Sequence, residues 1–187
     1  MAAVESARAS SSMVRGRKIF PVVDLFAGPG GLGEGFSSAQ GDDGAARFRC
    51  AISIERDAGS HSTLLLRHFY KSFGEEQVPD DYYDFLSGRI TLDELFRRFP
   101  ENHRHASLSA QRISLGSESR DLVRGLISGQ IGGESRWVLI GGPPCQAYSL
   151  VGRSRMKGRP DFEEDERHTL YLEYLRIVAD HRPPIFL

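Results

Sequence analysis

A glycine-rich segment between two apolar stretches constrains the fold of this chain more than any other feature. Gly28, Gly30 and Gly33 fit the pattern G-x-G-x-x-G, directly after an apolar run and before a helix predicted at 31–39. Glycines in this pattern let the bare backbone approach a ligand closely. A second apolar stretch at 50–55 completes a strand–helix–strand unit, so we expect an α/β fold with a parallel sheet.

An acidic residue follows this unit at an informative distance. Glu55 ends the second predicted strand, about 20 residues beyond Gly33, where a carboxylate accepts hydrogen bonds from ribose hydroxyls in nucleotide-binding α/β folds. The pair predicts an adenosine-type cofactor. A tight turn with a solvent-facing glutamate is the alternative. No Lys-Ser or Lys-Thr follows the glycines, which excludes a Walker A phosphate loop.

A cysteine stands in a rigid turn after a third apolar run. Pro143 and Pro144 follow the strand predicted at 137–140 and fix the backbone direction just before Cys145. A thiol held in this way suits nucleophilic attack on a bound substrate. A buried structural cysteine is the alternative, since free cysteine usually packs as a small apolar side chain.

The spacing of the apolar residues, together with the residues that begin or end helices and strands, predicts the remaining elements. The predicted strands and helices are strands at 19–25, 50–55, 137–140 and 185–187, and helices at 31–39, 58–73, 91–100, 119–131 and 167–180. We expect a loop at 101–105 and a disordered tail at 1–17, with a single domain over 18–187.

Composition excludes several classes of protein. A hydrophobic content of 40% is ample for a core, and a net charge of −1 means that any affinity for DNA must come from a local basic patch. No apolar run reaches the roughly 18 residues that cross a bilayer. We expect Cys50 to pack in a strand and predict no metal site. Four histidines are interpreted as structural: His61, His68, His103 and His105.

Three motifs in a fixed order give the chain a specific resemblance. Residues 24–31, then Glu55, then residues 142–149 with Pro144-Cys145-Gln146, resemble the S-adenosylmethionine motif, the acidic ribose-binding position and the nucleophile motif of the DNA cytosine-5 methyltransferase family. The resemblance covers residues 19–187, apart from a divergent middle. It implies a Rossmann-like, S-adenosylmethionine-dependent methyltransferase fold, with a mostly parallel sheet and helices on both faces.

The resemblance also implies a role for each matched residue. Cys145 would be the catalytic nucleophile, adding as a thiolate to C6 of a cytosine flipped out of double-stranded DNA, so that C5 accepts the methyl group. The implied cofactor-binding residues are Phe26, Ala27, Gly28, Gly30, Gly31, Glu55 and Pro144. The residues expected to meet DNA phosphates are Ser149, Arg153, Arg155, Lys157 and Arg159, for which a solvated basic loop is the alternative.

The sequence departs from the family's pattern in two places. The family has an acidic residue at the end of its third strand that contacts adenine, and residues 112–116 offer none. The family also continues beyond a strand like 185–187 with a Glu-Asn-Val motif, an arginine motif and a target-recognition region. We therefore expect a catalytic domain truncated at its C-terminus, weak or inactive alone, that works with a complementing C-terminal chain.

Two other functions remain open at this point. Gly28, Gly30, Gly33 and Glu55 also fit a dinucleotide-dependent oxidoreductase, although that function does not explain Pro144-Cys145-Gln146. A noncatalytic DNA-binding remnant of a methyltransferase is the third hypothesis. The methyltransferase function implies a bacterial protein of the cytoplasm or nucleoid.

Overall fold

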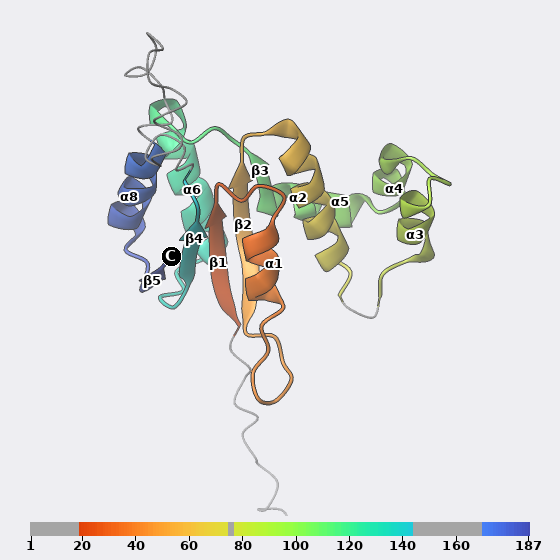
Figure 1. Ribbon diagram of the computed structural model, residues 1–187, viewed down its shortest axis with the longest axis horizontal. Coiled ribbons are helices and arrows are strands. Elements are labelled where there is room, and N and C mark those ends of the chain that lie inside the picture. The colour runs from red at the N-terminus through yellow and green to blue at the C-terminus, as the bar shows by residue number, and fades with distance from the viewer. Residues whose placement is uncertain (1–18, 75–76, 144–169) are drawn as a thin grey trace, which may run out of the picture.

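The computed structural model describes residues 19–74, 77–143 and 170–187. At its centre lies a five-stranded sheet with the order β3-β2-β1-β4-β5, in which all neighbouring strands are parallel (Figure 1). The strands are β1 (Phe20–Leu25), β2 (Phe48–Glu55), β3 (Ala110–Arg112), β4 (Val138–Gly141) and β5 (Ile185–Phe186). This sheet confirms the expected α/β class.

The strand order reverses at β1. The chain runs from β1 outward to β2 and β3, and then returns to the other side of β1 to form β4 and β5. Leu25 at the end of β1 pairs with Ile54 of β2 on one side and with Gly141 of β4 on the other. Loops therefore leave the carboxyl ends of β1 and β4 in opposite directions, which is where open α/β sheets bind ligands.

Helices cover both faces of the sheet. Helices α1 (Gly31–Ser37) and α2 (Ala58–Lys71) lie on one face, and α6 (Arg120–Ile131) and α8 (Leu170–His181) lie on the other (Figure 1). Because successive side chains of a strand point to opposite faces, Val22 packs beneath α1 whereas Val23 packs toward α6. The larger core on the α6 and α8 face contains Val23, Leu25, Ile52, Ile54, Leu115, Val123, Ile127, Trp137, Leu139 and Tyr174.

Three short helices extend the fold beyond β3. Helices α3 (Asp80–Leu86) and α4 (Leu92–Arg98) lie farthest from the sheet, and α5 (Pro100–Ser109) lies between them and α2 (Figure 1). The capping box predicted at Thr91 and Glu94 is present. The prediction of a loop at 101–105 was wrong, because these residues belong to α5. Pro100 stands in the first turn of that helix, where its missing N–H costs nothing.

The predicted tail at 1–17 lies outside the described residues, so its separation from a domain at 18–187 stays a prediction. Among the helices in the described ranges, none combines the length and apolar character needed to cross a bilayer.

Candidate functional site

The glycine-rich segment forms a tight turn between β1 and α1. Ala27 donates its backbone N–H to Ile54 O at 3.0 Å, which holds the start of the turn against β2. Gly30 has a φ of 89° and caps α1, and a Cβ at this position would lie 2.8 Å from the Leu64 side chain. The turn therefore needs glycine at position 30 for both its backbone conformation and its close approach to α2.

Glu55 is hydrogen-bonded to this turn. Its Oε2 accepts from the backbone N–H of Gly28 at 2.8 Å, and its Oε1 accepts from that of Asp57 at 2.7 Å. Asp57 in turn caps α2 by accepting from Ser60 N at 2.8 Å. The carboxylate thus has a fixed position at the end of β2, and it keeps lone pairs for further hydrogen bonds.

A cavity of about 880 Å³ opens at this carboxyl edge of the sheet. Phe26 after β1, Glu55 of β2, Arg112 of β3 and Gly142 after β4 contribute to its walls, and α6 and α8 close its other side. Small-molecule sites occupy about 300–1,000 Å³ and favour such switch points, so the cavity is large enough for a nucleoside-based cofactor.

Phe26 reaches this cavity through an uncommon backbone conformation. Its φ is 55°, in the left-handed region that residues with a Cβ seldom adopt. Leu25 already packs in the core on the α6 and α8 face, so regular strand alternation would turn Phe26 to the opposite face. The left-handed residue breaks that alternation, and the Phe26 ring packs against the same core and lines the cavity.

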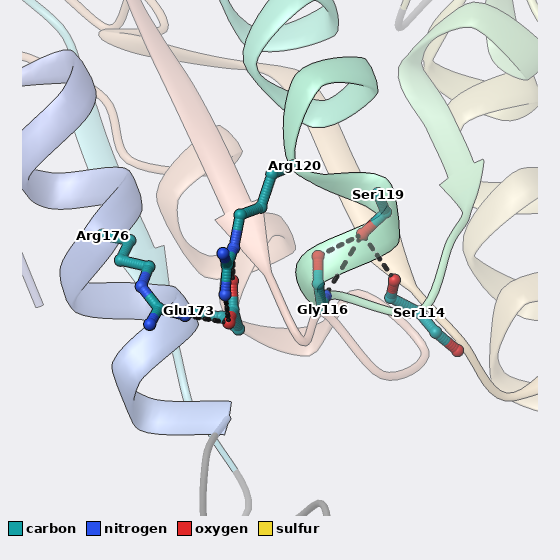
Figure 2. Close-up of polar contacts among 6 residues, drawn as sticks. All are labelled: Ser114, Gly116, Ser119, Arg120, Glu173 and Arg176. Carbon is teal, nitrogen blue, oxygen red and sulfur yellow. Dashed lines mark hydrogen bonds and ion pairs between the residues drawn. The ribbon is translucent and has the colours of Figure 1, made fainter.

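An ion pair between a buried carboxylate and a partly exposed guanidinium joins α6 and α8 on the far wall of the cavity. Glu173 of α8 accepts from Arg120 of α6 through two hydrogen bonds, Arg120 Nη2 to Oε1 at 2.7 Å and Nε to Oε2 at 3.0 Å (Figure 2). Arg176 also donates to Glu173. The bonds from Arg120 hold the pKa of Glu173 below its usual value. This pair was missed at the sequence level, because 53 residues separate its members.

A second polar group holds the segment between β3 and α6. Ser119 ends the short 3₁₀ turn η1 (Ser117–Ser119). Its hydroxyl donates to Ser114 O at 2.8 Å and accepts from Gly116 N at 3.2 Å (Figure 2). These bonds fold residues 114–119 into a wall of the cavity.

One buried carboxyl group lies behind the glycine turn. Asp24 of β1 is 1% exposed, and its Oδ2 has no hydrogen-bond partner among the described residues. Burial raises the pKa of Asp24 to about 7, against the opposing effect of the Gly33 backbone. Asp24 therefore carries a proton over much of the pH range in which ordinary carboxyl groups are charged.

Cys50 is held between β2 and α2 by a chain of polar contacts. Its Sγ lies 3.2 Å from Ser53 Oγ, and Ser53 Oγ lies 2.9 Å from His68 Nε2, between β2 and α2. Burial raises the pKa of the Cys50 thiol to about 12 and lowers the pKa of His68 to about 4. A thiol that stays protonated is unreactive, so Cys50 has the packing role expected from the sequence.

The structure brings several of the expected cofactor-binding residues to one place. Phe26 and Glu55 line the cavity, while Ala27, Gly28, Gly30 and Gly31 form the turn beside it. β4 ends at Gly141 and leads to Gly142 at the cavity wall. The other expected site residues lie outside the described residues: Pro144, Cys145, Ser149, Arg153, Arg155, Lys157 and Arg159.

The end of β3 carries a cation where the resemblance leads one to expect an acid. Arg112 is the last residue of β3, and its register partner on β2 is Glu55. Its Nε approaches Arg56 O at 3.5 Å, and no ion pair joins Arg112 to any acid in the ranges that the structure describes.

Comparison with known proteins gives consistent matches. The family model of the C-5 cytosine-specific DNA methylases matches residues 124–187. The type II methyltransferase M.Bpa9945I of Bacillus paralicheniformis is 33% identical over 191 residues, which covers 89% of this chain and 39% of that protein.

Two more relatives have lower identity and similar coverage of this chain. The type II methyltransferase M.AquIA of Picosynechococcus is 29% identical, covering 89% of this chain and 46% of its own length. A DNA-cytosine methyltransferase of Escherichia coli K12 is 26% identical, and the match covers 90% of this chain and 29% of that protein. The chain thus spans less than half the length of these relatives. Over most of its own length, the chain is thus similar to proteins named as type II or DNA-cytosine methyltransferases, and its C-terminal third matches the C-5 cytosine-specific DNA methylase model.

Proposed function

We propose that this chain carries the cofactor pocket and the nucleophile of an S-adenosylmethionine-dependent DNA cytosine-5 methyltransferase. The observation that carries the proposal is the hydrogen bond from Gly28 N to Glu55 Oε2 at 2.8 Å, at the switch point of a parallel sheet and beside a large cavity. The relatives' names supply the reaction, which this geometry alone does not define.

The residues present fit such a cofactor. The free lone pairs of Glu55 accept from the ribose hydroxyls, and the open backbone at Gly28, where nothing lies within 4 Å of a built Cβ, leaves room for the amino-acid part. Phe26 provides an apolar surface within the same cavity. When bound, S-adenosylmethionine supplies an electrophilic methyl group.

Cys145 is assigned the covalent step. Its thiolate adds to C6 of a cytosine flipped out of double-stranded DNA, which makes C5 nucleophilic, and the loss of the C5 proton later allows the Cys145–C6 bond to break. The basic residues 153–159 are assigned to DNA phosphates. The β4 strand delivers the chain to Gly142 at the cavity wall, three residues before Cys145 in the sequence.

Trapping the covalent adduct tests this assignment. Fluorine at C5 blocks the loss of the final proton, so duplex DNA containing 5-fluorocytosine should remain attached to Cys145 when S-adenosylmethionine is present. The mass of the complex is measured for the native chain and for Cys145→Ser, with Cys50→Ser as the matched control. An adduct that is lost only in Cys145→Ser supports the proposal.

The assay is run on the chain alone and again with a second polypeptide, which corresponds to the part of M.Bpa9945I that this chain does not cover. The second polypeptide is needed because the chain spans only 39% of that relative. Such a polypeptide stands in for the proposed complementing chain. If DNA and cofactor bind in both settings and no adduct forms, Cys145 does not have the proposed role. An adduct that persists in Cys145→Ser contradicts it equally.

A further inference from the structure

Arg112 and Glu55 are neighbours across two parallel strands. The register pairs Glu55 of β2 with Arg112 of β3, whose strands lie about 4.8 Å apart. Partner residues of parallel strands in register point to the same face, and both of these side chains line the large cavity. The Ile113 N–H donates to Glu55 O at 3.1 Å, which keeps the end of β3 beside Glu55.

The positions of the glycine turn and Glu55 set the direction in which a nucleoside lies. Gly28 is on the β1 side of Glu55, whereas Arg112 is on the β3 side. In a nucleoside, the 5′ substituent and the base are attached at opposite ends of the ribose. If the hydroxyls bind Glu55 and the 5′ substituent lies at the turn, the base must lie over the end of β3.

The walls at this end suit a purine ring in shape. Ile113 and Leu122 provide apolar surface in the cavity, and Leu122 is 57% exposed. Covering Leu122 with the flat face of a base would remove that surface from water.

The polarity of the end of β3 is defined by the guanidinium of Arg112. This group has N–H donors and no acceptor. Its charge helps to lower the pKa of Asp57, but in the described part of the chain no carboxylate forms an ion pair with it. It can donate to the ring nitrogens of a purine or lie against its face. It cannot accept a hydrogen bond from the exocyclic amine of adenine.

We propose that Arg112 contacts the purine of the bound nucleoside by donating to its acceptor atoms, and that the site therefore does not select for the 6-amino group. This inference rests on the proposed function, because it takes the ligand to be an S-adenosyl compound. Arg112 is a specificity-determining residue that makes the site tolerant of a 6-oxo purine.

A pair of ligands that differ only at this position tests the proposal. S-adenosyl-L-homocysteine carries an amine at C6 of the purine, and S-inosyl-L-homocysteine carries an oxygen there. We expect calorimetry to show that the native chain binds both, the inosyl compound at most about threefold more weakly than the adenosyl compound, because a donor group pairs with N7 in either base and can also donate to the 6-oxygen. Arg112→Asp should favour the adenosyl compound by about tenfold or more, the effect of one hydrogen bond.

Two control variants keep the interpretation clear. Arg97→Asp makes the same charge change on α4, away from the cavity, and should leave the ratio of the two dissociation constants unchanged. Glu118→Gln tests the exposed carboxylate that also lines the cavity and should leave the ratio unchanged too. Thermal unfolding of every variant checks that the fold is retained.

The outcomes separate this inference from the proposed function. If neither ligand binds the native chain, the proposed function and this inference both fail. If the adenosyl compound binds and the native chain rejects the inosyl compound by a hundredfold, the inference alone is overturned. It is also overturned if Glu118→Gln rather than Arg112→Asp changes the ratio, or if Arg112→Asp changes only the binding of DNA.

Discussion

The substitution Asp24→Asn should change how the stability of this protein depends on pH. Asp24 is 1% exposed behind the glycine turn, its Oδ2 has no partner among the described residues, and burial raises its pKa from 3.8 to about 7. The folded chain therefore holds a proton at this site in the pH range where the unfolded chain has lost it. Such a group stabilises the fold fully below the unfolded pKa, and that stability is lost as the pH rises toward the folded pKa.

The size of the effect follows from the width of this window. Each pH unit between the two pKa values costs about 1.4 kcal/mol, so raising the pH from about 5 to about 8 should destabilise the native chain by about 3 kcal/mol through this group. Asparagine has nearly the same shape and no charge. The free energy of unfolding of Asp24→Asn minus that of the native chain should therefore rise by about 3 kcal/mol over this range.

Urea unfolding followed by circular dichroism at several pH values measures this difference. His68 has an opposing effect, because burial lowers its pKa to about 4 and its contribution to stability therefore grows as the pH rises from there toward the pKa of histidine in the unfolded chain. Subtracting the profile of the native chain removes this contribution, which both proteins share. Asp42→Asn, at an exposed position, should track the native chain throughout. A difference between Asp24→Asn and the native chain that stays constant across the range would refute the reasoning.

Two further substitutions test how the sheet and the far wall of the cavity are built. In Gly141→Ala the new Cβ would lie 2.5 Å from Leu25 O, a backbone atom of the paired strand, so thermal unfolding should show a loss of about 2 kcal/mol; a loss below about 0.5 kcal/mol contradicts the close approach of β1 and β4. Glu173→Ala leaves Arg120 and Arg176 without their carboxylate, and because Arg120 is 40% exposed to water we expect a loss of about 1–2 kcal/mol. That loss should largely disappear when it is measured in an Arg120→Ala background, and a full additive loss in the double variant would argue against the ion pair.

Local patterns were sufficient to predict most of the sheet and the helices that cover it. The first two strands and the helix between them were predicted from apolar runs beside a glycine-rich turn. The structure places β1 and α1 within the predicted limits, and β2 begins two residues earlier, at Phe48. The run at 137–140 became β4 for the same reason. These strands are buried on both faces of the sheet, so each is a continuous apolar run that is visible in the sequence alone.

The region before β3 was harder to predict for a physical reason. The residues at 101–105 are all polar, and only Ala106 is buried along α5, so the helix has little apolar periodicity of its own. Its stability comes from packing against other helices: His103 stacks on Phe96 of α4, and Ala106 packs beside Phe69 of α2. Tertiary packing overrode a local pattern that is typical of a loop.

The candidate site could likewise be predicted only where its residues are close together in the sequence. Glu55 and the glycines lie within one strand–helix–strand unit, and their spacing was enough to predict that they meet. Arg120 and Glu173 come from helices separated by more than fifty residues, and no short motif links them. The position of Arg112 beside Glu55 also depends on strand register, which becomes known only when the sheet is assembled.

The affinity of the full chain for S-adenosyl-L-homocysteine, measured by calorimetry on the native protein and on Glu55→Ala, tests the central claim most directly. Glu101→Ala, an exposed glutamate on α5, serves as the matched control. The account predicts binding by the native chain and by Glu101→Ala, and a loss of about tenfold to a hundredfold in Glu55→Ala, because charge-assisted hydrogen bonds to the ribose disappear. Equal affinity in the native chain and Glu55→Ala would contradict the assignment of this cavity as the cofactor site.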